Sequence, residues 1–311
     1  MCTSIAYHCE NFCFGRNMDL EYSFGERIIA CGRHFPLKDA CGNINYGHFA
    51  IIGVGTVIDG YPMYADAMNE FGLCAAGLNF PACAHFPKSS DAEVLISPYE
   101  LIPFVLSRCA SVDDVRAMLS HACIVDVPFS ESVPNATLHW HIADRHSSIT
   151  VESTSTGLCV YENTAHVLTN SPHFDRQMSH LELFSRLTPS ACGERHLLGV
   201  GAVGLPGDLS SPSRFVRAAF LLGCLPDDAV GDAACDRLLS VLSAVAMTDG
   251  AVTDADGNIH RTTYSSCARP SEQKYTVKWA DELSPVTVSL ADIDLDSASL
   301  TFPTSDKRAN I

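Results

Sequence analysis

The order of patterned segments along the chain is the feature that most restricts its fold. In the first half of the 311 residues, apolar and polar side chains repeatedly alternate with the period of a strand, beginning with residues 1–7. Most helical patterns follow in one block, and short strand patterns return after Tyr264. This order indicates an α+β protein with helices layered on antiparallel sheets. No repeat or linker-like boundary is visible, so we expect a single domain over residues 1–311.

Individual elements are predicted from alternation, capping residues and helical spacing. We expect strands at residues 1–7, 12–16, 49–54, 74–78, 137–143, 148–152, 158–162, 166–168, 275–279 and 285–290. We expect helices at residues 97–109, 111–121, 214–223 and 232–247, and a polar tail from Thr304. The helix at 97–109 is predicted from Ser97 as a cap and Pro98 in the first turn.

Composition and charge exclude several classes of function. The formal net charge of −16 argues against binding to nucleic acid or to an anionic membrane, because a polyanion would be repelled. There is no apolar run long enough to span a bilayer and no secretory signal, so we expect a soluble, cytoplasmic protein. The 14 cysteines contain no Cys-x-x-Cys motif and are scattered among apolar residues, which favours small buried side chains over disulfides or metal ligands.

Three short motifs have simpler structural interpretations. Residues 199–204 spell a dinucleotide fingerprint, but Pro206 follows where a helix should begin, so we expect a glycine-rich loop. Residues 254–258 resemble the start of a calcium loop with its glycine displaced, which indicates an acidic turn. His139 and His141 share one face of a strand and are expected to form a half-buried polar face. No Gly-x-Ser-x-Gly marks a serine nucleophile.

A cysteine directly follows the initiator methionine. Removal of Met1 would leave Cys2 with a thiol and a free amine, whose ordinary pKa values near 8.5 and 7.7–8.0 allow them to share a proton. Such a residue is a nucleophile with its own base, although a cysteine at this position can also be accidental. A hairpin of the first two strands would place Arg16 beside Cys2. Alternation puts Arg16 and Asp19 on opposite faces, so both can serve Cys2 only if the strand ends or bulges between them.

Several uncommon short sequence motifs occur together along the chain. They are Phe-Gly-Arg-Asn-Met-Asp at 14–19, Ala-Gly-Leu-Asn-Phe-Pro at 76–81, Leu-Thr-Asn-Ser-Pro at 168–172, and Gly-Leu-Pro-Gly-Asp at 204–208 followed by Ser-Arg-Phe at 213–215. In these motifs, and in their order from Cys2 to at least Cys267, the sequence closely resembles the choloylglycine hydrolase family. This family of bile salt hydrolases and penicillin V acylases has an N-terminal nucleophile. The resemblance implies a four-layer αββα sandwich of two antiparallel sheets flanked by helices.

The resemblance also implies roles for particular residues. Cys2 would attack an amide carbonyl and form a thioester, without metal or cofactor, while Arg16 favours the thiolate and Asp19 holds the amine. The oxyanion would be bound by the Asn170 side chain and near the main chain of Asn79, with Arg214 in the surrounding network. The implied substrate-binding residues, each of which could equally be plain core, are Met18, Ile58, Phe129, Val133 and Leu138.

The substrate and the assembly remain open at this point. The leading expectation is hydrolysis of glycine- or taurine-conjugated bile salts. Penicillin V or N-acyl homoserine lactone acylase activity and a non-catalytic bile-acid or lipid-binding role are the alternatives. Penicillin V acylases tend to have tyrosine where this chain has Asn79, which favours the first. A homo-oligomer, dimer or tetramer, is expected, but residues 181–199 are shorter than the family insertion that assembles a tetramer, which puts that form in doubt.

Overall fold

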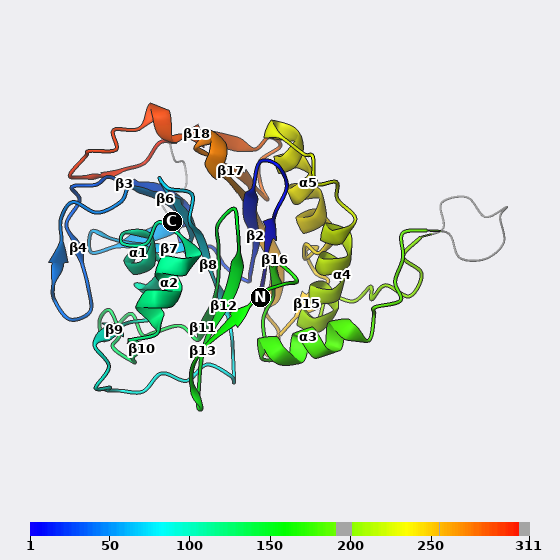
Figure 1. Cartoon of the computed structure of the whole chain (residues 1–311), viewed down its shortest axis with the longest axis horizontal. Coiled ribbons are helices and arrows are strands. Elements are labelled where there is room, and N and C mark those ends of the chain that lie inside the picture. Colours follow the sequence, from blue (N-terminus) through cyan, green and yellow to red (C-terminus); the bar gives the residue numbers. More distant parts are fainter. Residues whose placement is uncertain (191–200, 255, 305–311) are drawn as a thin grey trace.

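The computed structural model describes residues 1–190, 201–254 and 256–304, and it contains two large antiparallel sheets that face each other (Figure 1). Helices α1 (Leu101–Leu106) and α2 (Val112–Leu119) cover one sheet on its outer side. Helices α3 (Phe174–Glu182), α4 (Ser211–Gly223) and α5 (Gly231–Ala244) cover the other. The architecture is therefore a four-layer αββα sandwich, which confirms the expected α+β fold.

The sheet beneath α3, α4 and α5 is called sheet A. Its strands are β1 (Cys2–Tyr7), β2 (Cys13–Leu20), β14 (Val167–Leu168), β15 (Val252–Thr253), β16 (Ile259–Arg269), β17 (Lys274–Trp279) and β18 (Val286–Ser289). They run in the order β14-β1-β2-β16-β17-β18, and β15 pairs with β16. The first two strands therefore lie inside the sheet, with a partner on each side.

The sheet beneath α1 and α2 is called sheet B. Its strands are β3 (Arg27–Cys31), β6 (Ile51–Ile58), β7 (Tyr61–Asn69), β8 (Cys74–Asn79), β11 (Leu138–Ala143), β12 (Ser148–Thr154), β13 (Gly157–Glu162) and β19 (Leu300–Thr301). Their order is β13-β12-β11-β8-β7-β6-β3-β19. Two small pairs complete the described strands: β4 (Leu37–Lys38) with β5 (Ile44–Asn45), and β9 (Val94–Ile96) with β10 (Ala122–Ile124). Short 3-10 helices occur at Pro270–Glu272 and Leu290–Asp292.

The N-terminal hairpin forms as the alternation predicts, with Cys2 opposite Met18 and Ser4 opposite Arg16. Strand β2 is longer than expected and continues through Asp19 to Leu20. The irregularity lies in the neighbouring strand β16, where the pairing shifts between residues 262 and 264. Because β2 itself neither ends nor bulges, Arg16 and Asp19 remain on opposite faces of the sheet.

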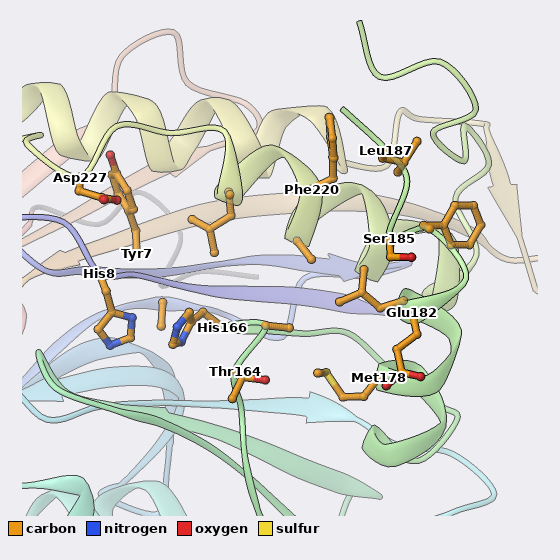
Figure 2. Close-up of a pocket in the computed structure, with 17 residues that line it drawn as sticks. Tyr7, His8, Thr164, His166, Met178, Glu182, Ser185, Leu187, Phe220 and Asp227 are labelled. Atoms are coloured by element: carbon orange, nitrogen blue, oxygen red, sulfur yellow. The ribbon is translucent and has the colours of Figure 1, made fainter. Parts of the chain in front are cut away.

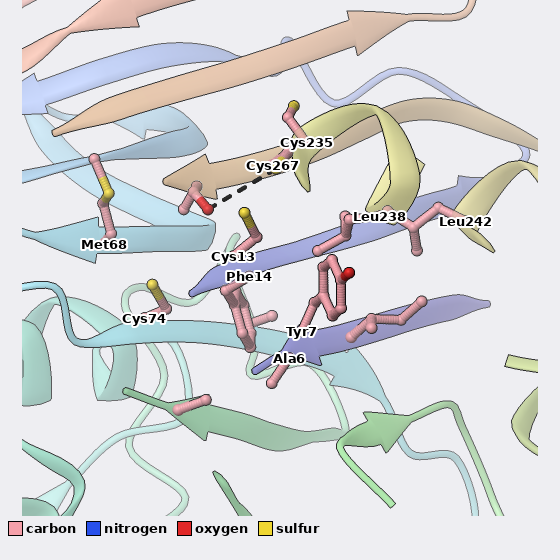
Figure 3. Packing of buried hydrophobic residues seen from close by; sticks show 14 of the residues in the cluster. Ala6, Tyr7, Cys13, Phe14, Met68, Cys74, Cys235, Leu238, Leu242 and Cys267 are labelled. Carbon is pink, nitrogen blue, oxygen red and sulfur yellow. Dashed lines mark hydrogen bonds between the residues drawn. The ribbon is translucent and has the colours of Figure 1, made fainter. Parts of the chain in front are cut away.

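Sheet A is packed closely on both faces. Figure 3 shows Leu238 and Leu242 of α5 beside the strands of the hairpin, within one buried apolar cluster. The contact is close at Gly15, where an added Cβ would lie 2.6 Å from a methyl carbon of Leu238 and 2.2 Å from the Ser266 carbonyl oxygen. Only glycine fits between α5 and β16 at this point.

Several boundaries differ from the prediction. The helix expected from Ser97 begins at Leu101, after a turn in which the Glu100 N–H donates to the Ser97 carbonyl at 3.1 Å. The Ser97 hydroxyl donates to the Val127 carbonyl. Helix α5 ends at Ala244, three residues early. The helix expected at 111–121 forms as α2, where Ser111 and Asp114 close a capping box. The elements absent from the prediction are β3, β7, β16 and α3, together with the short strands β4, β5, β9, β10, β15 and β19 and the two 3-10 helices.

The two strand histidines are a further correction, because His139 and His141 are completely buried between the sheets. His139 contacts the Glu152 carboxylate at 3.1 Å, and His141 contacts the Ser4 hydroxyl at 2.8 Å. The expectations for residues 199–204, for the short segment 181–199 and for the tail after Thr304 fall partly or wholly outside the described residues. None of the described helices combines the length and apolar character needed to cross a membrane.

Candidate active site

Cys2 is the first residue of β1, and its side chain lies between the two sheets with only 3% of the residue exposed. Nη2 of Arg16 lies 2.6 Å from its Sγ, and the Met18 sulfur lies 3.8 Å from it. Arg16 is itself completely buried and donates to the carbonyls of Ala65 and Gly77 on sheet B at 2.9 and 2.8 Å. The guanidinium is thus fixed by both sheets against the thiol.

The charge of Arg16 is maintained despite its burial. Burial alone lowers the pKa of the guanidinium, but the neighbouring Cys2, Tyr264 and Asp66 outweigh it and raise that pKa above its usual range. A permanent cation in contact with a sulfur favours the thiolate over the thiol. The predicted pairing of Arg16 with the Cys2 thiol is therefore present in the geometry.

The main chain of Cys2 is held by two distant side chains. Its N–H donates to Oδ1 of Asn170 at 2.8 Å, and its carbonyl accepts from Nη1 of Arg214 at 2.6 Å. Arg214 also donates to Oδ1 of Asn170 at 2.8 Å, while Nδ2 of Asn170 donates to the Asn79 carbonyl at 2.7 Å. Because arginine only donates, these contacts fix which end of the Asn170 amide is oxygen. Nδ2 carries a second hydrogen, for which none of the described residues is a hydrogen-bond partner.

Asp19 lies on the helix side of sheet A. Its Oδ1 accepts from the Thr262 hydroxyl at 2.6 Å, and its Oδ2 lies 3.9 Å from Nη1 of Arg214. This buried Oδ2 has no hydrogen-bond partner in the structure. Burial raises the pKa of the Asp19 carboxyl, and Arg214 opposes that rise. With Met1 retained, the carboxylate makes no hydrogen bond to the Cys2 nitrogen, so the expected contact is not formed in this form of the chain.

The structure brings the six predicted catalytic residues into one region, but Asn79 differs in detail. Its side chain is exposed and accepts from the Thr137 hydroxyl at 3.0 Å. Its carbonyl, rather than its N–H, contacts Asn170.

The predicted substrate-binding residues are more dispersed. Met18 contacts the thiol, and Leu138 lies opposite Asn79 where β8 pairs with β11. Phe129 instead packs on Tyr61, with ring centroids 5.7 Å apart. It lines a separate cavity of about 620 Å³.

Ile58 and Val133 are the two remaining predicted binding residues. Val133 is close to Phe129 in the sequence, and Ile58 is close to it through Tyr61. Ile58 pairs with Tyr61 at the end of the β6–β7 hairpin, and Val133 forms an isolated bridge with Ser130. Of the five predicted binding residues, Met18 contacts the Cys2 sulfur, at 3.8 Å.

A second cavity, of about 540 Å³, lies between α3, α4 and the end of β1 (Figure 2). Met178 and Leu222 line its apolar wall, and the rings of His8 and His166 lie 4.3 Å apart at one end. Burial lowers the pKa of both histidines, for His166 to about 4. This cavity includes none of the predicted site residues.

Sequence reasoning missed the groups that hold Asn170 in place. The Ser211 hydroxyl accepts from the Asn170 N–H at 2.9 Å, and the Gln177 side chain donates to the Asn170 carbonyl. The Thr169 hydroxyl joins them by donating to Gln177 at 2.8 Å. Thr169 belongs to the motif at residues 168–172, whereas nothing in the sequence marks Gln177.

Comparison with known proteins identifies the family. The family described as linear amide C–N hydrolases, choloylglycine hydrolase family, matches residues 2–302. The chain belongs to the choloylglycine hydrolase family.

Among curated members of this family, a bile salt hydrolase/transferase of Lactiplantibacillus plantarum is 38% identical over 310 residues, covering 96% of this chain and 95% of the relative. A conjugated bile acid hydrolase of Lactobacillus acidophilus is 33% identical, covering 96% and 99%. The C2A mutant of the Clostridium perfringens conjugated bile acid hydrolase superposes with a TM-score of 0.89 at 34% identity, covering 99% and 98%. A penicillin V acylase of Agrobacterium tumefaciens, at 23% identity and a TM-score of 0.79 over 96% and 90%, shares the fold.

Proposed function

We propose that this choloylglycine hydrolase hydrolyses the amide bond of glycine- or taurine-conjugated bile salts, with Cys2 as its nucleophile after removal of Met1. The observation that carries the proposal is the contact of 2.6 Å between Arg16 and the Cys2 sulfur at the start of the chain, with Asn170 bound to the same residue. The names of relatives at 33 to 38% identity support the bile salt as substrate.

Removal of Met1 converts the Cys2 nitrogen into an amine. The unpartnered Oδ2 of Asp19 is the buried acceptor that suits this amine once it is protonated. The amine takes the thiol proton, Arg16 stabilises the thiolate, and sulfur attacks the amide carbon. The free Nδ2 hydrogen of Asn170 and the main chain near Asn79 then stabilise the oxyanion, each donor contributing about 2.7–4 kcal/mol.

The tetrahedral intermediate collapses to a thioester as the amine delivers a proton to the leaving glycine or taurine. Water then attacks the thioester, the bile acid leaves as a carboxylate, and the thiol and amine are regenerated. This chain's own groups supply the nucleophile, the base and the oxyanion donors, so the proposal includes no metal or cofactor.

An apolar steroid binds mainly by burial, at about 25 cal/mol per Å² removed from water. We propose that Met18 and Leu138 contact it beside the thiol, and that Ile58, Phe129 and Val133 belong to the wall farther out. Phe129 and Ile58 both contact or pair with Tyr61, so this outer wall is one connected group of side chains.

A substrate panel tests the proposal. Glycocholate, taurocholate, penicillin V and an N-acyl homoserine lactone are compared at equal concentrations of wild-type enzyme and of the Cys2→Ala variant. We expect turnover of a conjugated bile salt to exceed that of the other two substrates and to vanish in the variant. Preferred turnover of penicillin V or of the lactone would show that a bile salt is not the preferred substrate. Equal turnover by Cys2→Ala would show that Cys2 is not the nucleophile.

A second candidate activity is acyl transfer to an amine, favoured by relatives that are named hydrolase/transferase. The thioester would be attacked by an amino acid amine in place of water, giving a new amide and the free thiol. Adding a second amino acid to the glycocholate reaction tests this, because a new conjugate must appear by mass spectrometry.

We also propose that the enzyme acts in the cytoplasm as a homo-oligomer, dimer or tetramer. Light scattering during size-exclusion chromatography measures its mass, and a monomer at the concentrations used in assays would contradict the oligomer.

A further inference from the structure

A second buried carboxylate lies behind Arg16, on the opposite sheet. Asp66 belongs to β7 and is 2% exposed. It accepts from the hydroxyls of Tyr264 and Ser266, each at 2.6 Å, and from the hydroxyl of Tyr275. All three hydroxyls donate to the carboxyl oxygens. The Asp66 side chain therefore links sheet B to sheet A.

Two of the three partners of Asp66 belong to the rows of sheet A that contain Cys2 and Arg16. Cys2 lies opposite Met18, which lies opposite Tyr264. In the next row of the same face, Arg16 lies opposite Ser266. Asp66 thus bonds to the β16 member of each row, while the carbonyl of the preceding residue, Ala65, accepts from Arg16. One residue pair of β7 holds both the guanidinium and the strand beside it.

Arg16 needs an anion that lasts through the reaction. A buried guanidinium without a counter-charge is strongly unfavourable. The Cys2 thiolate supplies that charge only until the thioester forms, because the acylated sulfur is neutral. The Asp66 side chain forms no bond in the acyl transfer, and it is among the groups that raise the pKa of Arg16.

We propose that Asp66 is a positioning residue that acts through Arg16: it is the permanent counter-charge of the guanidinium and limits how strongly Arg16 stabilises the Cys2 thiolate. This inference rests on the proposed function of Cys2 and extends it to a residue outside the implied catalytic set. The thiolate is thereby kept reactive, since an overstabilised thiolate is a weaker nucleophile.

The other charged or titratable groups near this pair are few among the described residues. Those acting on Arg16 and Cys2 are Asp19 from β2, Arg214 from α4 and Tyr264 from β16. Once Met1 is removed, the α-amine of Cys2 joins them. Those acting on or bonded to Asp66 are Arg16, Tyr264, Tyr275 and Cys74 from β8. Replacing Asp66 by Asn removes one negative charge from this set and keeps the size of the side chain.

The test measures the rate of Cys2 alkylation by iodoacetamide against pH, using mass spectrometry of the N-terminal peptide. We expect Asp66→Asn to move the midpoint to lower pH by about half a unit or more, the direction set by removing a negative charge near a thiolate. With a Brønsted slope of about 0.4–0.5, this shift should lower kcat for glycocholate by about twofold or less and leave KM within twofold. Tyr275→Phe removes a donor but leaves the charge, so it should lower Tm without moving the midpoint.

An unchanged midpoint in Asp66→Asn, or an equal downward shift in Tyr275→Phe, would overturn the inference. If Asp66→Asn does not fold, infrared difference spectra of the wild-type protein on alkylation of Cys2 decide: a band from a newly protonated carboxyl would contradict a permanent counter-charge, and its absence supports one. Alkylation requires no bile salt, so a failure of the proposed substrate leaves this result independent.

Discussion

Asn170 accepts a hydrogen bond from the main-chain nitrogen of Cys2 at 2.8 Å, although the two residues are 168 positions apart in the chain. The same amide oxygen binds Arg214, and the opposite end of the amide binds the main chain of Asn79. One side chain therefore links the first strand, the loop after β14, helix α4 and sheet B. Its position determines where an oxyanion donor lies relative to the sulfur.

Processing of Met1 should control activity. We expect the purified active protein to begin at Cys2, because the proposed base is the amine that removal of Met1 exposes. Intact-mass measurement checks this directly. A fully active preparation that retains Met1 would contradict the role of the amine.

Replacing Asn170 by Asp should lower kcat by about 10²–10³, corresponding to about 2.7–4 kcal/mol for one oxyanion donor. The change keeps an acceptor for Cys2 and Arg214 and removes the Nδ2 donor. Thr137→Ala is the control, since Thr137 contacts only the exposed side chain of Asn79 among these residues. Steady-state kinetics of both variants give the comparison, and similar losses would argue against a specific donor.

Replacing Arg214 by Lys should reduce both stability and turnover. A single ammonium cannot reproduce the contacts of the guanidinium with Cys2, Thr3 and Asn170, so we expect a loss of about 2 kcal/mol or more and at least a hundredfold lower kcat. Arg217→Lys on the same helix is matched, because the hydrogen bonds of Arg217 within the described part of the chain go to the carbonyls of Ala244, Pro206 and Asp208. It should lose stability with little change in kcat. Thermal unfolding and kinetics separate the two effects.

Acid should destabilise the protein partly through His166. Burial and the neighbouring His8 lower the pKa of His166 from 6.5 to about 4. An unfolded chain therefore binds this proton first, and stability present above pH 6.5 is lost as pH falls toward 4. We expect His166→Asn to show a smaller drop in Tm between pH 7 and pH 4.5, since asparagine tolerates the positive φ of 56°. An identical drop in both proteins would show that groups other than His166 cause the acid sensitivity.

Local sequence patterns were sufficient to predict that Arg16 lies beside the proposed nucleophile, Cys2. Alternation in the first strand and a turn near residue 10 placed Arg16 beside Cys2, and the structure confirms this register. The same alternation predicts that Asp19 lies on the face of the strand opposite Arg16, and the structure confirms this placement. These relationships depend on neighbouring strands, whose pairing the chain encodes within 20 residues.

The groups behind Arg16 could not be predicted in this way. Strand β7, which contains Asp66, is largely buried and includes Pro62, so it has no simple alternation. Strand β16 carries Tyr264 beyond an irregular pairing that breaks its period. Helix α3, which carries Gln177, has no side-chain cap at His173. Their partners are set by how two sheets face each other, which no local window contains.

The interior position of β1 has a practical meaning for anyone preparing this enzyme. The end of a chain is usually its loosest part, yet here strand β1 has a neighbour on both sides, and residue 2 is paired with Met18 and bound by side chains from distant elements. A partly refolded molecule that lacks either sheet or helix α4 cannot assemble the site. Recovered activity therefore counts completely folded molecules, which makes a turnover assay a stringent reporter of refolding yield.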